Sequence, residues 1–94
     1  TMQVVDGDVS AQAEQVMKNL NAVLSNAGVS WAEVAKTTIF LADMGDFAAV
    51  NAIYARYMPD PPPARSTVQV AALPKGGSVE IEAIARKVGY PSAR

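Results

Sequence analysis

The stretch from Pro61 to Arg86 restricts the fold of this 94-residue chain more than any other part of it. It opens with three consecutive prolines, which cannot continue a helix because the proline ring fixes φ and removes the backbone N–H. Two segments rich in β-branched residues follow, 65–73 and 78–87, with the turn sequence Pro-Lys-Gly-Gly between them. The pattern predicts a stiff extended lead-in and two strands that pair as a hairpin.

Two other segments have the spacing of amphipathic helices. Residues 9–27 follow a candidate N-cap, Asp8, and precede Gly28, which suits a left-handed C-cap. Residues 43–58 begin with acidic side chains that favour a helix N-terminus. The apolar stripes of the two helices comprise Ala13, Val16, Leu20, Val23, Leu24 and Ala27, and Phe47, Val50, Tyr54 and Tyr57.

The order of these elements predicts an α+β fold. Residues 36–43 are apolar on both alternating faces, as expected of an interior strand, and residues 2–5 could add a short strand before the first helix. We expect one domain over residues 1–94, with 88–94 as a flexible tail, and a mixed sheet with both helices on one face. The other face would carry either Thr67, Gln69, Glu80 and Glu82, or the valines that alternate with them along the same strands. A half-apolar face of this kind argues for an oligomer.

The composition excludes several kinds of chemistry. The chain contains no cysteine and no histidine, so it can form no disulfide, no thiolate nucleophile and no Ser-His or Cys-His catalytic pair. The net charge is −1 and lysine and arginine form no run, so a nucleic-acid interface is not indicated. No apolar stretch is long enough to span a membrane. Any catalysis would use carboxylates, Arg, Lys, Tyr, hydroxyl groups, backbone groups or water.

A few polar side chains occupy unusual positions and are candidates for function. Arg65 stands at the start of a strand beside the prolines, a costly position for a cation. Glu80 and Glu82 interrupt an apolar strand. Asn51 lies in the middle of a helix, where asparagine is unfavourable. The alternatives are a surface ion pair for Arg65, and a solvated side chain or a local hydrogen bond to the backbone for Asn51.

The predicted hairpin separates the two main candidates. If Leu73 pairs with Ser78 across the turn, Glu80 lies opposite Ala71, six residues from Arg65. At the rise of a β-strand that separation is roughly 20 Å. We therefore expect either a bulge or twist in the hairpin, or a site that takes residues from two subunits.

Four segments carry motifs that occur together in one known family. The first is PPPARSTVQVAALPKGGSVEIEAIA, which starts at Pro61. The second runs from Asp43 to Phe47, continues with Val50, Asn51 and Tyr54, and fits "DxxDFxxVNxxY". The third, Val34 to Thr38, fits "VvKTT", and the fourth is the helical segment 12–24. In these segments and in one register over nearly the whole chain, the sequence resembles the Rid family, the YjgF-type imine deaminases.

The resemblance implies a chorismate-mutase-like α+β fold and a homotrimer with ligand clefts between subunits. The implied location is the cytoplasm, with an organelle as the alternative. The implied reaction is detoxifying hydrolysis of 2-iminobutanoate and 2-iminopropanoate to 2-oxo acids and ammonia, with no metal or organic cofactor. The family also has two N-terminal strands with a cleft tyrosine, in "GPYSQA", and a cleft serine, in "SGQ". This sequence lacks them, so we expect an N-terminally truncated member.

Five residues match site positions of the family. Arg65 matches the "PAR" arginine that binds the substrate carboxylate, and Glu80 matches the first glutamate of "IEIEA", which holds or activates water. Asn51, Phe47 and Thr67 match positions that line the cleft. The resemblance thus implies Glu80 as the catalytic residue and the other four as substrate-binding residues.

Two other functions stay open at this point. The missing tyrosine and serine favour a module that binds a 2-oxo acid or similar carboxylate through Arg65 without turnover. A ribonuclease or translation-inhibitor role, found in some family members, is less favoured because of the net charge and the lack of histidine.

Overall fold

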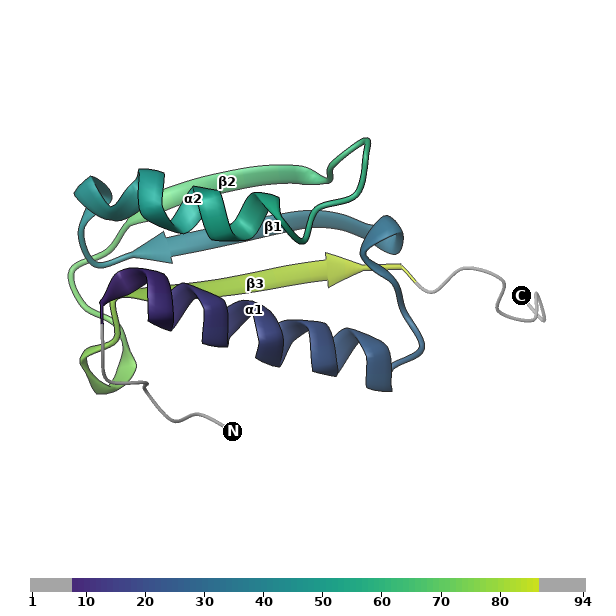
Figure 1. The fold of residues 1–94 in the computed structure, drawn as a ribbon, viewed down its shortest axis with the longest axis horizontal. Helices are drawn as coiled ribbons and strands as arrows, with labels where there is room; N and C mark the ends of the chain where they lie inside the picture. Colours follow the sequence, from purple (N-terminus) through teal and green to yellow (C-terminus); the bar gives the residue numbers. More distant parts are fainter. Residues whose placement is uncertain (1–7, 87–94) are drawn as a thin grey trace.

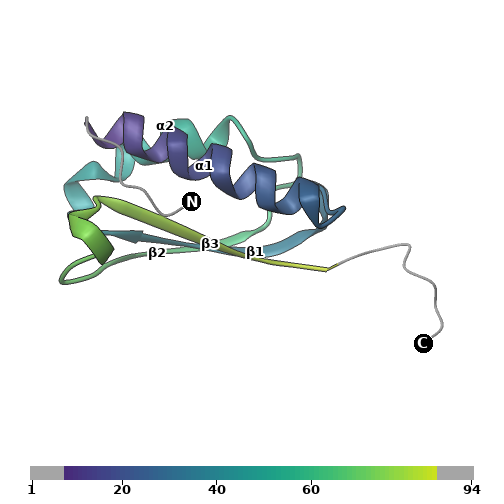
Figure 2. The ribbon, with the colours of Figure 1, turned by 90° about the horizontal axis from the view of Figure 1, so that it is seen from below.

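The computed structural model describes residues 8–86. Its helices and strands are α1 (Val9–Asn26), β1 (Val34–Leu41), α2 (Phe47–Ala55), β2 (Ala64–Gln69) and β3 (Val79–Ala85). Both helices lie side by side on one face of a single three-stranded sheet (Figures 1 and 2). The predicted α+β class, with two helices on one face of a mixed sheet, is confirmed. The expected strand at residues 2–5 and the expected tail 88–94 lie outside the described residues.

The predicted caps of the first helix are confirmed. The Asp8 carboxylate accepts a hydrogen bond of 2.9 Å from the backbone N–H of Ala11. At the other end Gly28 has a φ of 76°, and the N–H of Val29 donates to the carbonyl of Leu24 at 2.9 Å. This pattern is a Schellman motif, and it requires the left-handed conformation that glycine adopts without strain.

The buried stripe of α1 differs partly from the prediction. Ala13, Met17 and Leu24 are buried, whereas Val23 is 62% exposed. Met17 was not predicted. It is fully buried in the core, where its flexible, unbranched side chain can fill irregular space.

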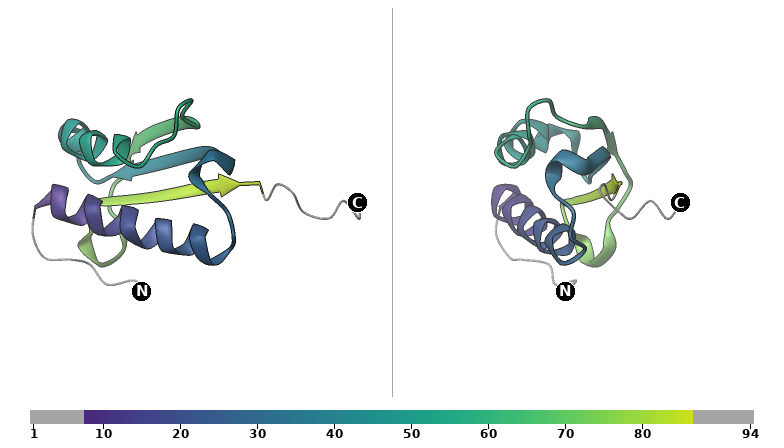
Figure 3. Two further views of the ribbon diagram at one scale, coloured as in Figure 1. Left: turned by 45° about the vertical axis from the view of Figure 1, so that its right-hand side comes forward. Right: turned by 90° about the vertical axis from the view of Figure 1, so that its right-hand side faces the viewer.

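The predicted hairpin between residues 65–73 and 78–87 is wrong. The strand order is β2-β1-β3, so β1 lies between the other two strands and pairs in parallel with β2 and antiparallel with β3. β2 ends at Gln69, earlier than predicted, and a loop with a short 3₁₀ turn at Pro74–Gly76 carries the chain to the far side of β1 (Figure 3). The physical reason is that β1 is apolar on both faces, which suits the interior position better than an edge.

The register of the sheet decides which face each strand residue occupies. Thr37 pairs with Arg65 and Ile39 with Thr67, whereas Phe40 pairs with Glu80. Directly paired residues point to the same face. Arg65 and Thr67 are therefore on the helix-covered face. The expectation that Thr67 and Gln69 share a face with Glu80 and Glu82 is wrong, because Gln69 pairs with the buried Leu41 and Glu82 with Thr38.

The core lies between the helices and this sheet face. Its buried members are Ala13, Met17, Ile39, Leu41, Val50, Tyr54, Val79 and Ile81. Thr37 is the buried polar residue of the described part of the chain, and its hydroxyl is 2.5 Å from that of Tyr54. No helix within residues 8–86 has the length and hydropathy needed to cross a membrane.

The opposite face of the sheet carries no helix in the described part of the chain (Figure 2). Val68 of β2 is 40% exposed there and Ile84 of β3 is 60% exposed. Glu80 and Glu82 are exposed on the same face. We call this the outer face; it is partly apolar, as the sequence predicts for one face of the sheet.

Candidate functional site

The guanidinium of Arg65 lies against one face of α2. Its Nη1 donates a hydrogen bond to Oδ1 of Asn51, and its Cζ is 5.3 Å from the ring centroids of both Phe47 and Tyr54. These three helix residues are spaced four and three apart, so they share one side of α2. The structure thus brings together three predicted site residues, Arg65, Asn51 and Phe47.

Among the described residues, no acidic side chain neutralises the charge of Arg65. No salt bridge joins it to a carboxylate within residues 8–86, and its partners there are an amide oxygen and two aromatic rings. Aromatic faces stabilise a cation without cancelling its charge. The alternative that Arg65 is half of a surface ion pair finds no partner in the described part of the chain, and the guanidinium keeps donors for an anionic ligand.

An open groove of about 460 Å³ begins at this guanidinium. Its lining residues are Asn51, Tyr54, Ala55, Met58, Pro59, Pro62, Pro63 and Arg65. The volume falls within the range of small-molecule sites. The groove therefore has a cationic end at Arg65 and an apolar wall built from the end of α2 and the prolines.

Thr67 lies near Arg65 but does not line the groove. It is two residues further along β2 on the same face, opposite Ile39. Its Oγ1 is buried and has no hydrogen-bond partner within the described residues. A buried hydroxyl without a partner is uncommon in folded proteins, so this atom is a local exception beside the site.

Glu80 is not brought to Arg65 within one chain. It is exposed on the outer face, opposite Phe40, whereas Arg65 is on the helix-covered face opposite Thr37. One chain therefore does not bring Arg65 and Glu80 together, as the sequence predicts. The sheet between the two side chains separates them, and not the length of a hairpin.

Sequence reasoning missed several residues of the groove. Tyr54 was assigned to the apolar core stripe, and Pro62 and Pro63 only to a stiff lead-in. The signal for Tyr54 was present, because it lies three residues after Asn51 and seven after Phe47, on the same helix face. Nothing in the sequence indicated that the prolines and Met58 would face Arg65, because that contact depends on how β2 packs beside α2.

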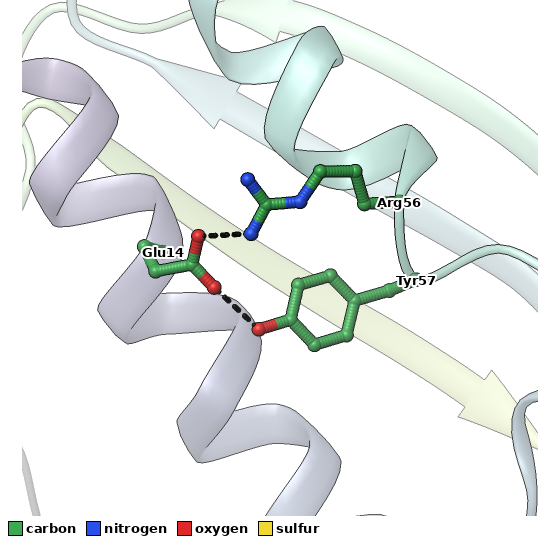
Figure 4. Close-up of polar contacts among 3 residues, drawn as sticks. All are labelled: Glu14, Arg56 and Tyr57. Carbon is green, nitrogen blue, oxygen red and sulfur yellow. Dashed lines mark hydrogen bonds and ion pairs between the residues drawn. The ribbon is translucent and has the colours of Figure 1, made fainter.

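A second polar cluster, which the sequence did not predict, joins the two helices (Figure 4). Glu14 of α1 accepts a 2.5 Å hydrogen bond from Nη2 of Arg56 and a 2.6 Å hydrogen bond from the hydroxyl of Tyr57. The Tyr57 hydrogen bond, with a smaller contribution from Arg56, lowers the pKa of Glu14 below its ordinary value of 4.5. The same hydrogen bond raises the pKa of Tyr57. The cluster fixes the chain just before Met58, where the groove wall begins.

Within 8–86, no three acidic side chains gather in a way that could hold a metal ion. The polar side chains that line the groove are those of Arg65, Asn51 and Tyr54.

Comparison with known proteins places this geometry in a family. Residues 1–87 match the family described as Endoribonuclease L-PSP. The chain is 52% identical over 91 residues to the 2-iminobutanoate/2-iminopropanoate deaminase of Rattus norvegicus, covering 97% of this chain and 66% of the rat protein. It is 53% identical over 85 residues to Reactive Intermediate Deaminase A, chloroplastic, of Arabidopsis thaliana, covering 90% of this chain and 46% of the plant protein.

A solved structure shows the same fold. The crystal structure of RidA from an Antarctic Psychrobacter species aligns with a TM-score of 0.84 at 46% identity, covering 92% of this chain and 69% of that one. The chain thus spans about half to two thirds of the length of the curated relatives described here. The family match, these identities and the shared fold agree, and the chain belongs to the endoribonuclease L-PSP family, the YjgF-type Rid proteins.

Proposed function

We propose that this protein is an imine deaminase that hydrolyses 2-iminobutanoate and 2-iminopropanoate to the corresponding 2-oxo acids and ammonia. The observation that carries the proposal is the guanidinium of Arg65 at the end of the groove, free of any acidic partner in the described chain and oriented by Asn51. The names of relatives that share about half of its residues support the same reaction.

The groove suits the recognition that this reaction requires. A 2-imino acid carries a carboxylate beside its C=N bond, and a guanidinium binds a carboxylate through two parallel hydrogen bonds. Asn51 restricts the rotation of Arg65, and the rings of Phe47 and Tyr54 lie against the guanidinium. Binding in this manner would hold the imine carbon at a fixed place in the groove.

The chemical step needs water and two proton transfers. Water adds to the imine carbon and gives a carbinolamine; the C–N bond then breaks, a C=O bond forms, and ammonia leaves. We assign both transfers to Glu80: it passes one proton from the attacking water to the imine nitrogen, and then a second proton from the carbinolamine hydroxyl to the leaving amine. The overall balance is one imino acid and one water to one 2-oxo acid and one ammonia, and no redox change occurs.

Glu80 must come from a neighbouring copy in this proposal. It lies on the outer face and Arg65 on the helix-covered face. We propose a homotrimer in which the outer face of one subunit covers the groove of the next. The exposed Val68 and Ile84 support this arrangement, because apolar side chains on an uncovered sheet face favour association.

We place this activity in the cytoplasm, as the family resemblance suggests. The Arabidopsis relative is named a chloroplastic protein, so an organelle is the alternative. Fractionation of the source cells, followed by detection of the protein, would separate the two.

A carboxylate-binding module without turnover is the second candidate. The observation that favours it is that no carboxylate lines the groove in the part of the chain that the structure describes. In that case Arg65 would still bind 2-oxo acids, and no variant of Glu80 would change the affinity.

The test is imine hydrolysis with matched arginine variants. An amino-acid oxidase generates the imine, semicarbazide traps what remains, and the rate of trapping is followed. Arg65→Ala should lower kcat/KM at least about 100-fold, because a charged, bidentate hydrogen-bond partner is lost. Arg65→Lys should restore only part of that loss.

Arg86→Ala is the control, because Arg86 is exposed directly after β3 and does not line the groove. It should leave kcat/KM unchanged. Full activity in Arg65→Ala would refute the assigned role of the guanidinium. Arg65-dependent binding of 2-oxo acids with no hydrolysis would favour the binding module.

A further inference from the structure

The groove extends beyond the part that a carboxylate would occupy. Arg65 and Asn51 form its polar end, and the hydroxyl of Tyr54 is engaged with Thr37. The rest of the lining is apolar and consists of Ala55, Met58, Pro59, Pro62 and Pro63. The site therefore divides into an anion-binding end and an apolar wall.

The size of the groove exceeds the needs of the smallest imino acid. With its carboxylate on Arg65, an acid whose side chain is a methyl group would leave most of the roughly 460 Å³ to water. A longer apolar side chain would displace that water from the wall, which is favourable. A charged side chain would find no partner among the lining residues and would lose hydration.

The wall is held in place before any ligand arrives. Proline residues have a fixed φ, so Pro62 and Pro63 lose little conformational freedom on binding. Glu14 accepts hydrogen bonds from Arg56 and Tyr57, directly before Met58. A preformed wall loses less conformational entropy on binding than a mobile one.

From this geometry we propose that Met58, Pro62 and Pro63 form a side-chain pocket that selects 2-imino and 2-oxo acids with long apolar side chains over the three- and four-carbon acids. The inference rests on the proposed function, since it assumes a carboxylate on Arg65. The preferred compounds are those derived from large aliphatic amino acids. Met58 is the residue that adjusts to side chains of different shape, because methionine is flexible and unbranched.

The test measures the affinity of the 94-residue chain for straight-chain 2-oxo acids from pyruvate to 2-oxohexanoate by NMR titration. Each added methylene should tighten binding about threefold until the wall is covered. In Met58→Ala this gain per methylene should fall by about half, while the affinity for pyruvate stays within about twofold. Imine hydrolysis over the same side-chain series should show the same order in kcat/KM.

Three further variants make the result specific. Met58→Leu should restore the dependence on length, because it replaces the apolar volume. Met44→Ala is the matched control, since Met44 is 40% exposed and does not line the groove. Pro62→Ala, at an exposed position, tests the wall without touching the core, to which Met58 also contributes.

The outcomes separate this inference from the proposed function. The side-chain pocket would be overturned by equal affinities for all the acids in the unmodified chain, or by an unchanged gain in affinity per methylene in both Met58→Ala and Pro62→Ala. In either case Arg65-dependent imine hydrolysis would still support the deaminase. Absence of hydrolysis and of Arg65-dependent binding for every acid would contradict both.

Discussion

At the scale of single residues, Glu14 shows how one carboxylate can organise two helices. It accepts hydrogen bonds from Arg56 and Tyr57, and its side chain is only 25% exposed. A hydrogen bond to the charged form of a carboxyl group favours that form, so the pKa of Glu14 falls below 4.5. Its contribution to the free energy of unfolding must therefore depend on pH.

Glu14→Gln should lower the melting temperature at pH 7 and leave it nearly unchanged in acid. Because the pKa in the folded state is depressed, the stabilisation is complete above about pH 4.5 and disappears as the pH falls through the folded-state pKa. Thermal unfolding followed by circular dichroism at both pH values measures the difference. Glu82→Gln, an exposed carboxyl on β3, is the control. Parallel pH profiles for Glu14→Gln and the unmodified chain would contradict this account.

At the scale of elements, the packing of α2 on β1 joins the core to the site. Tyr54 is buried, its hydroxyl pairs with that of Thr37, and its ring lies against Arg65. The same residue thus belongs to the core on one side and to the groove on the other. A change in this contact should affect both stability and the position of the guanidinium.

Tyr54→Phe should destabilise the fold by about 1–2 kcal/mol, because it leaves the buried Thr37 hydroxyl without its partner. Thr37→Val should cost a similar amount alone, and the double variant should cost less than the sum of the two. Urea unfolding of the four proteins gives the coupling energy. Strict additivity would show that the two hydroxyls do not interact.

The same elements show what the sequence could predict. Asp8 and Gly28 mark the ends of α1 correctly, because caps depend on side chains next to the helix. The hairpin prediction failed because strand pairing depends on distant segments, and β1 competes for both neighbours. The grouping of Phe47, Asn51 and Arg65 followed from the family resemblance, whereas the groove wall at Met58 needed the tertiary packing.

At the scale of the whole molecule, the sheet itself separates the two groups that the proposed reaction needs. Arg65 lies on the face covered by the helices, and Glu80 lies on the outer face with the exposed Val68 and Ile84. Within residues 8–86, a single copy therefore has the groove that we propose binds a carboxylate, but no acidic side chain lines it. Catalysis by the proposed mechanism therefore requires the assembly of at least two copies.

The most direct test mixes two variants that are each inactive. Arg65→Ala and Glu80→Gln are purified separately, unfolded, and refolded together in equal amounts, and mixed trimers are verified by native mass spectrometry. If each site takes Arg65 from one copy and Glu80 from the next, roughly a quarter of the sites in random trimers are intact, and about that fraction of the original imine hydrolysis should return. Verified mixed trimers that remain as inactive as the separate variants would contradict the shared site.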